Sequence, residues 1–180
     1  MKSRFEACLK ATLGFEGGLS DDPTDRGGRT NLGITTGTLN RARRMGIVHV
    51  ETVDELTRHD AATIYAAFYW DRCRCGQLSD GLDLVVFDCA VNCGNGTAGR
   101  CLQRALGDMG HPVVVDGAIG AQTCGAAGNA CAEGKKAALI EACLLRREEY
   151  YRAVIEAHPE QQRFARGWQN RVNRLRGMVA

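Results

Sequence analysis

The sequence predicts a mainly α-helical protein with one small β element near its N-terminus. Apolar residues recur at helical spacing along most of the chain, and its 180 residues include only three prolines. Asp, Gly and Thr concentrate over residues 19–38, which indicates a loop and a short hairpin. The hydrophobic fraction of 44% is typical of a packed globular protein, and a chain of this size can form a core without a metal or a disulfide.

The N-terminal half begins with an amphipathic helix that Gly17-Gly18 ends. One face of this helix carries Phe5, Leu9, Thr12, Leu13 and Glu16. In the hairpin we expect a turn at residues 26–28 and a strand near Thr30–Thr35. Thr57-x-x-Asp60 is typical of a capping box, and it predicts a helix that runs to about Trp70.

The C-terminal half is predicted to contain four more helices. Two shorter ones run from about Leu84 to Cys93 and from about Ala98 to Leu106, and a loop follows over residues 107–120. A long amphipathic helix covers about Lys135 to Ala157. The last helix is expected to direct four apolar residues inward: Phe164, Trp168, Val172 and Leu175.

Charge and cysteine content narrow the function classes. Residues 135–180 carry ten Lys or Arg against five Asp or Glu, which suits an anionic partner or a solvated helix face. The arginine pairs Arg163/Arg166 and Arg171/Arg174 are expected to steer the protein toward an anionic polymer, and both nucleic acid and cell wall fit that description. Nothing resembles a nucleic-acid-binding signature, and no apolar run is long enough to span a membrane. The nine cysteines lack the paired spacing of zinc ligands, so we expect most of them to be small core residues.

Two carboxyl groups near the N-terminus are candidates for acid catalysis. Glu16 lies on the apolar face of the first helix at its last turn, where partial desolvation and the helix dipole raise the pKa of a carboxyl. Asp25 follows nine positions later on the loop. Glycoside hydrolysis requires two such carboxyl groups across a sugar bond. From position alone, Glu16 is equally compatible with a surface residue at a helix end.

The segment from Glu16 to Thr35 reads E-G-G-L-S-D-D-P-T-D-R-G-G-R-T-N-L-G-I-T. It resembles the N-terminal signature of glycoside hydrolase family 108, the phage and prophage N-acetylmuramidases, in which an aromatic residue stands where this chain has Leu19. Further family motifs follow in order along nearly the whole chain. They include F-D-x-A-V-N-x-G from Phe87, L-Q-x-A-L-G from Leu102, D-G-x-I-G-x-x-T from Asp116 and F-x-x-G-W-x-x-R-V from Phe164.

The resemblance implies a lysozyme-like fold and hydrolysis of the β-1,4 bond between N-acetylmuramic acid and N-acetylglucosamine, without a metal or other cofactor. Glu16 matches the family's general acid. More distantly, the spacing resembles the Glu-x8-Asp-x(4–5)-Thr arrangement of phage-type lysozymes. Asp25 then matches a second carboxylate that stabilises the transition state or orients water. Thr30, five positions after Asp25 where six is usual, matches a hydroxyl that helps to place the water. An inverting outcome would need the two carboxyl groups about 6.5–9.5 Å apart.

Three further residues are candidates for substrate binding. Asn92 lies one helical turn after Asp88, and either it hydrogen-bonds a substrate acetamido or hydroxyl group, or it is a buried amide bonded to backbone. Asp88 is expected to be structural. Tyr69 and Trp70 either stack on sugar rings or belong to the core, and Trp168 is expected in the core.

The resemblance divides the chain into two regions. Residues 1–97 form the lysozyme-like catalytic region, and residues 98–180 resemble a predicted peptidoglycan-binding module, packed with the first as one compact unit. The expected partner is the glycan strand of peptidoglycan, bound by a monomer. The module either grips the wall or completes the fold.

An endolysin is therefore the leading hypothesis. Because no signal peptide precedes the first helix, we expect synthesis in the cytoplasm and action on the cell wall after release, for example through a holin. The alternatives are a non-catalytic peptidoglycan-binding or secretion-related protein on the same fold, and a lytic transglycosylase, which needs one acidic residue but no activated water.

Overall fold

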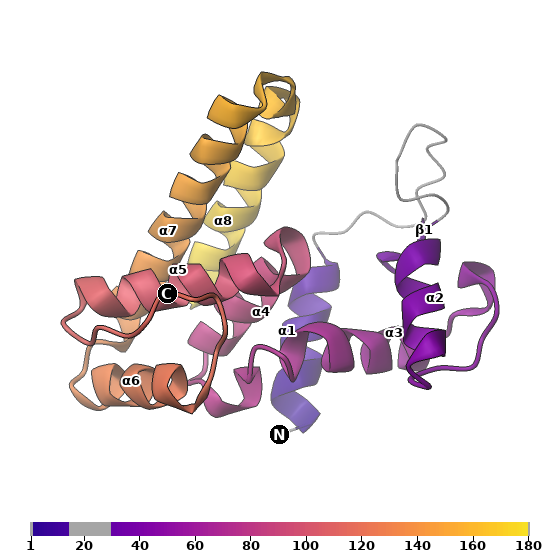
Figure 1. Ribbon diagram of the computed structural model, residues 1–180, viewed down its shortest axis with the longest axis horizontal. Coiled ribbons are helices and arrows are strands. Elements are labelled where there is room, and N and C mark those ends of the chain that lie inside the picture. Colours follow the sequence, from indigo (N-terminus) through magenta and orange to yellow (C-terminus); the bar gives the residue numbers. More distant parts are fainter. Residues whose placement is uncertain (1, 15–29, 180) are drawn as a thin grey trace. The chain divides into compact units, whose positions relative to one another are not determined.

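The computed structural model describes residues 2–14 and 30–179, with side chains from Arg4 onward. Its described part consists of helices and one two-stranded antiparallel sheet near the N-terminus (Figure 1), so the predicted mainly α fold class is confirmed. The chain divides into two units, residues 1–71 and 72–180, which are described separately below. In the described residues, no helix combines the length and the apolar character needed to cross a membrane.

The first unit is built from short elements around a small apolar core. In chain order these are α1 (Lys2–Leu13), β1 (Thr30–Asn31), β2 (Ile34–Thr35), α2 (Thr36–Arg44), the 3-10 turn η1 (Val53–Glu55), α3 (Arg58–Tyr65) and the π-helical segment η2 (Ala66–Trp70). Helix α1 packs against α3. The core side chains Ile34, Leu39 and Ile64 are at most 1% exposed.

The hairpin differs from the sequence-based prediction. Residues 26–28, where a turn was expected, lie outside the described residues. The range predicted as one strand is itself a complete hairpin, in which Thr30 pairs with Thr35 and Asn31 pairs with Ile34. Its turn residues Leu32 and Gly33 both have positive φ, 51° and 74°, as the tightest two-residue hairpins require. The prediction failed because it looked for the turn at Gly27-Gly28 and not at a leucine.

Two boundaries of the first unit depend on threonine caps. The Thr35 side chain accepts a hydrogen bond from the Thr38 N–H at 3.2 Å and so starts α2, an unpredicted helix that begins within the region predicted as loop and hairpin and continues beyond it. The predicted capping box of α3 is confirmed. The Asp60 N–H donates to Thr57 Oγ1 at 3.1 Å, and the Thr57 N–H donates to the Asp60 carboxylate at 3.0 Å. The Thr57 hydroxyl also donates to the Asp60 carboxylate, and this bond, with the one from the Thr57 N–H, lowers the pKa of Asp60.

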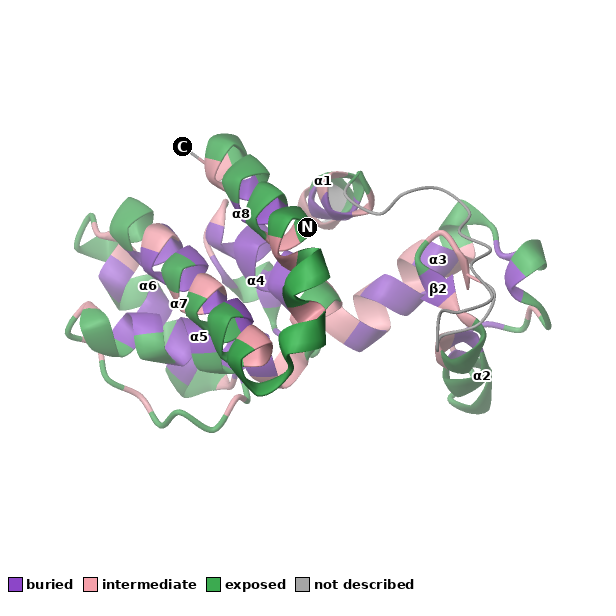
Figure 2. Ribbon diagram, turned by 90° about the horizontal axis from the view of Figure 1, so that it is seen from above, coloured by how far each residue is buried: buried purple, intermediate pink, exposed green. Residues whose placement is uncertain are grey.

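The second unit is a helical bundle around α4. Its elements are η3 (Cys75–Gln77), α4 (Leu82–Cys93), α5 (Asn95–Asp108), α6 (Ala121–Ala132), α7 (Lys136–Ala157), the 3-10 turn η4 (Pro159–Phe164) and α8 (Ala165–Val179). Every residue of α4 from Leu82 to Ala90 is buried, which is typical of a central helix. Helices α5 and α7 pack on α4, and α8 lies beside α7 (Figure 1). Figure 2 shows the buried residues gathered along α4, α5 and α7.

Two features of the second unit depart from the predictions. Helix α6 was not predicted, because its sequence A-Q-T-C-G-A-A-G-N-A-C-A contains small residues and no large apolar stripe. Phe164 was expected to face inward on the last helix, which is wrong. It ends η4 and is 42% exposed, because Pro159 follows the end of α7 and starts a separate 3-10 turn before α8.

The cysteines are free thiols, and seven of the nine are buried. Their predicted role as small core residues is thus confirmed for most of them. Burial raises the pKa of Cys73 to about 12, and the hydrogen bond between Cys89 and Cys101, with burial, raises the pKa of Cys89 to about 12.

Candidate functional site

Of the three predicted catalytic residues, the structure describes only Thr30. Glu16 and Asp25 lie outside the described residues. Thr30 is half-buried in β1, opposite Thr35. Two hydrogen bonds join this hairpin to the rest of the first unit. Asn31 donates through Nδ2 to the Val53 carbonyl at 2.8 Å, and the Tyr65 hydroxyl donates to the Leu32 carbonyl at 3.2 Å.

The two predicted aromatic sugar contacts are placed differently in the first unit. Tyr69 is half-buried in η2, with its ring centroid 5.7 Å from that of Tyr65. Trp70 is 7% exposed, and its ring meets Phe5 edge-on at 5.4 Å. Tyr69 thus keeps part of its ring accessible, whereas most of the Trp70 ring packs inside the unit.

Asn92, the third predicted substrate contact, lies at the C-terminal end of α4 in the second unit. Gly94, with φ 85° and ψ 152°, ends this helix and leads directly into α5. Such a conformation is strained for any residue with a side chain. The corner leaves Asn92 exposed, although Asp88, one turn earlier on the same helix, is completely buried.

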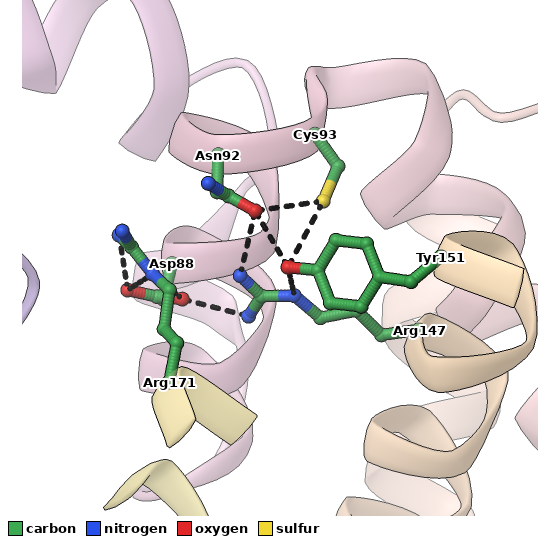
Figure 3. A network of polar contacts seen from close by, with 6 residues as sticks. All are labelled: Asp88, Asn92, Cys93, Arg147, Tyr151 and Arg171. Atoms are coloured by element: carbon green, nitrogen blue, oxygen red, sulfur yellow. Dashed lines mark hydrogen bonds and ion pairs between the residues drawn. The ribbon is translucent and has the colours of Figure 1, made fainter. Parts of the chain in front are cut away.

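Asp88 is the centre of a buried ion-pair cluster. Arg147 of α7 donates to its carboxylate through Nη1 at 2.7 Å. Arg171 of α8 donates to it through Nη2 at 2.8 Å and through Nε at 3.0 Å (Figure 3). Arg147 and Asp88 are fully buried, and Arg171 is 8% exposed. The structural role expected for Asp88 is confirmed. The expectation that Arg171 steers the protein from its surface is wrong, because its charge is bound in the interior.

The same arginine extends the cluster to Asn92. Arg147 donates through Nε to the Tyr151 hydroxyl at 2.8 Å and through Nη2 to Asn92 Oδ1 at 3.2 Å. The Tyr151 hydroxyl lies 2.6 Å from Asn92 Oδ1, and the Cys93 thiol lies 3.2 Å from it. Burial raises the pKa of Tyr151, and a hydrogen bond with Cys89, together with burial, raises that of Cys93. Both groups therefore keep the protons that they donate.

A row of aromatic rings continues outward from this cluster. The Tyr151 and Trp168 rings stack with their centroids 4.7 Å apart and their planes at 11°. The Phe164 ring centroid lies 6.1 Å from that of Trp168, and the Arg163 guanidinium carbon lies 4.7 Å from the Phe164 ring centroid. Trp168 was expected in the core but is only half-buried.

A second polar cluster holds the loop between α5 and α6. Gln103 is 1% exposed and donates to Asp116 at 2.7 Å, while it accepts a hydrogen bond from the Gly117 N–H at 2.8 Å. The Ala118 N–H also donates to Asp116, and these bonds lower the pKa of that carboxyl. The L-Q-x-A-L-G and D-G-x-I-G motifs thus meet through their polar residues.

The sequence analysis did not select Arg147, Tyr151 or Cys93 as site residues. A signal was present, since Arg147 and Tyr151 are four apart on a predicted helix, as are Asp88 and Asn92 on another. That these two pairs meet could not be read from spacing. The cluster offers donors and one carboxylate, and among the described residues no group of three or more His, Cys, Asp or Glu is arranged to hold a metal ion.

Comparisons with known proteins divide the chain at another place, because the two family matches meet between residues 94 and 97, inside the second structural unit. The family description "Glycosyl hydrolase 108" matches residues 9–94, and "Predicted Peptidoglycan domain" matches residues 97–173. The cluster therefore joins Asp88, Asn92 and Cys93 of the first match to three residues of the second.

The fold also matches a solved structure, "Structure of Brucella abortus SagA", with a TM-score of 0.78 and 30% sequence identity, over 99% of this chain and 95% of that one. A search of curated proteins found no match. The chain belongs to glycosyl hydrolase family 108, and its C-terminal part is a predicted peptidoglycan domain.

Proposed function

We propose that the chain is an N-acetylmuramidase that hydrolyses the β-1,4 bond between N-acetylmuramic acid and N-acetylglucosamine in peptidoglycan. One observation carries the proposal: the E-G-G, Asp and Thr motif lies inside the glycosyl hydrolase match, and a predicted peptidoglycan domain follows it in the same chain. The first part supplies acid chemistry for a glycosidic bond, and the second supplies the class of glycan.

In this mechanism Glu16 protonates the glycosidic oxygen as the bond to the anomeric carbon breaks. Asp25 stabilises the oxocarbenium-like transition state or orients the attacking water, and the Thr30 hydroxyl helps to place that water. The hairpin that carries Thr30 is tied to η1 and α3 by the bonds of Asn31 and Tyr65, which supports a fixed position for the hydroxyl in the first unit.

We propose the glycan strand as substrate and the half-buried Tyr69 as a ring that contacts a sugar. Trp70 has little exposed surface and contributes less in this scheme. The biological setting that fits best is a phage or prophage endolysin, active as a monomer on the cell wall after release from the cytoplasm.

The direct test of the acid is the pair of variants Glu16→Gln and Glu6→Gln, assayed for reducing ends released from purified sacculi. Glu6 is an exposed carboxyl on α1 and controls for the loss of a charge. E16Q is expected to lose at least about 100-fold in rate, the lower range for a general acid, while E6Q keeps the wild-type rate. Binding of wild type to sacculi without release of sugar ends would contradict the proposal and favour a non-catalytic wall-binding protein.

A further inference from the structure

The carbonyl oxygen of Asn92 is saturated by donors from its own protein. Arg147 Nη2, the Tyr151 hydroxyl and the Cys93 thiol all lie within 3.2 Å of Oδ1. A carbonyl oxygen has two lone pairs, and Arg147 Nη2 and the Tyr151 hydroxyl fill both, which leaves no capacity for a further donor.

The chemistry of these neighbours also fixes which way the amide points. Arginine has only donors, so the atom that faces Arg147 must be the oxygen. The Tyr151 oxygen already accepts from Arg147 Nε at 2.8 Å, which leaves its own proton for Asn92. Turning the amide over would place its NH₂ group against the Arg147 guanidinium, donor against donor. The side-chain nitrogen of Asn92 therefore points away from all three donors, as Figure 3 shows.

Asn92 is thus an exposed residue whose outer group can act only as a donor. No described residue accepts a hydrogen bond from its Nδ2, although Asn92 lies at an exposed helix corner above a buried, fully hydrogen-bonded cluster. A polar group held this rigidly loses little conformational entropy when it binds a ligand.

We propose that the Asn92 NH₂ group is a dedicated donor to the acetamido carbonyl of a sugar in the glycan strand, and that Arg147 and Tyr151 are positioning residues for it. The proposal rests on the proposed function and deepens it. The acetamido carbonyl is the acceptor that every sugar of an N-acetylated glycan carries. A deacetylated sugar presents an ammonium group instead, which has no lone pair to accept a bond.

The positioning residues come from the segment that matches the predicted peptidoglycan domain, whereas Asn92 comes from the glycosyl hydrolase segment. Under this proposal, the C-terminal segment contributes to substrate recognition by orienting a residue of the hydrolase segment. It has this role whether or not it also binds the wall independently.

The test is Asn92→Asp in the full-length protein, assayed on N-acetylated and on chemically N-deacetylated preparations of the same purified sacculi. Aspartate keeps an oxygen that accepts from Arg147 and Tyr151, replaces the outward donor by an acceptor, and adds a negative charge beside Arg147. Wild type is expected to hydrolyse the acetylated wall at least about tenfold faster in kcat/KM. N92D is expected to lose about tenfold on the acetylated wall and to lose or reverse this preference, the effect of one unsatisfied polar contact.

Two further variants separate positioning from folding. Tyr150→Phe removes a hydroxyl from the exposed tyrosine next to Tyr151 and should match the wild type on both preparations. Tyr151→Phe keeps the ring that stacks on Trp168 but removes a donor to Oδ1, so it should raise KM on the acetylated wall while changing kcat little. If N92D has a much lower Tm than the wild type, Y151F tests the contact instead. A KM raised on the acetylated wall but not on the deacetylated wall supports it, and a KM equal to that of the wild type on both refutes it.

The outcomes are distinguishable. N92D with an unchanged rate and preference, or with an equal loss on both preparations, would refute this contact while leaving the muramidase intact. A wild type that releases no sugar ends from either preparation would refute both the function and the contact.

Discussion

Replacing Asp88 by Asn should destabilise the second unit severely. The change removes the carboxylate that two arginines share, at distances of 2.7 Å from Arg147 and 2.8 Å from Arg171. Arg147 is fully buried and Arg171 is 8% exposed, so water cannot replace the lost charge. Breaking a buried ion pair by removing one partner costs about 3–5 kcal/mol. For a unit of this size that lowers Tm by roughly 12–20 °C, at about 4 °C per kcal/mol.

The matched control is Asp108→Asn. Asp108 also binds an arginine through both oxygens, with contacts of 2.6 Å and 2.7 Å from Arg146 Nη2, but its side chain is 40% exposed. Exposed pairs contribute up to about 1 kcal/mol, so D108N should cost about 1 kcal/mol or less. Urea and thermal unfolding followed by far-UV circular dichroism measure both variants. If D88N costs no more than D108N, the reasoning that burial makes the Asp88 cluster indispensable is refuted.

Three further predictions concern the packing, the pH response and the thiols of the second unit. Gly99→Ala should lower the free energy of unfolding by about 1–3 kcal/mol, because an added Cβ would lie 2.1 Å from the Gly117 carbonyl oxygen. Gly107→Ala on the same helix meets nothing within 4 Å and should raise the free energy of unfolding by about 0.5–1 kcal/mol. Urea unfolding measures both variants. The pKa of Asp116 is lowered in the folded state by its bonds from Ala118 and Gln103, so its contribution to stability is complete above the ordinary Asp pKa and is lost as the pH falls through the lowered value. The stability difference between wild type and Asp116→Asn should accordingly shrink as the pH falls below about 4, and a constant difference would argue against these bonds. Most of the nine thiols should react with a thiol reagent at pH 8 only after unfolding, since burial and raised pKa values such as that of Cys89, about 12, keep them protonated; complete labelling of the native protein would contradict the buried placement.

The parts of the fold that could be predicted are those with local signals. The Thr57 capping box predicted the start of α3, and Gly94 predicted the end of α4. Helices α2 and α6 were missed because their apolar faces are small. Helix α2 buries only Leu39 and Ala42, and α6 is made mostly of Ala, Gly and Cys.

The polar cluster shows what a single sequence does not reveal. Asp88 and Asn92 were selected because they share one helix face, yet their partners lie 55–83 residues away on two other helices. Which face of α7 meets α4 depends on tertiary packing. Arg171, one of the four arginines expected to attract an anionic partner, was assigned to the surface because a charge on an amphipathic helix is usually solvated. In the structure Arg171 instead forms a buried ion pair with Asp88, the carboxylate that also pairs with Arg147.

The most direct test of the central claim is the identity of the sugar end that the wild-type protein releases from purified sacculi, read by mass spectrometry of the soluble fragments. A muramidase breaks the bond between the anomeric carbon of N-acetylmuramic acid and the O4 oxygen of N-acetylglucosamine. Water then adds to that anomeric carbon. The account therefore predicts fragments that end in reducing N-acetylmuramic acid and that are absent after incubation with E16Q. Fragments that end in a 1,6-anhydro ring would identify a lytic transglycosylase, and fragments that end in reducing N-acetylglucosamine would show cleavage of the other glycosidic bond; either result would contradict the account.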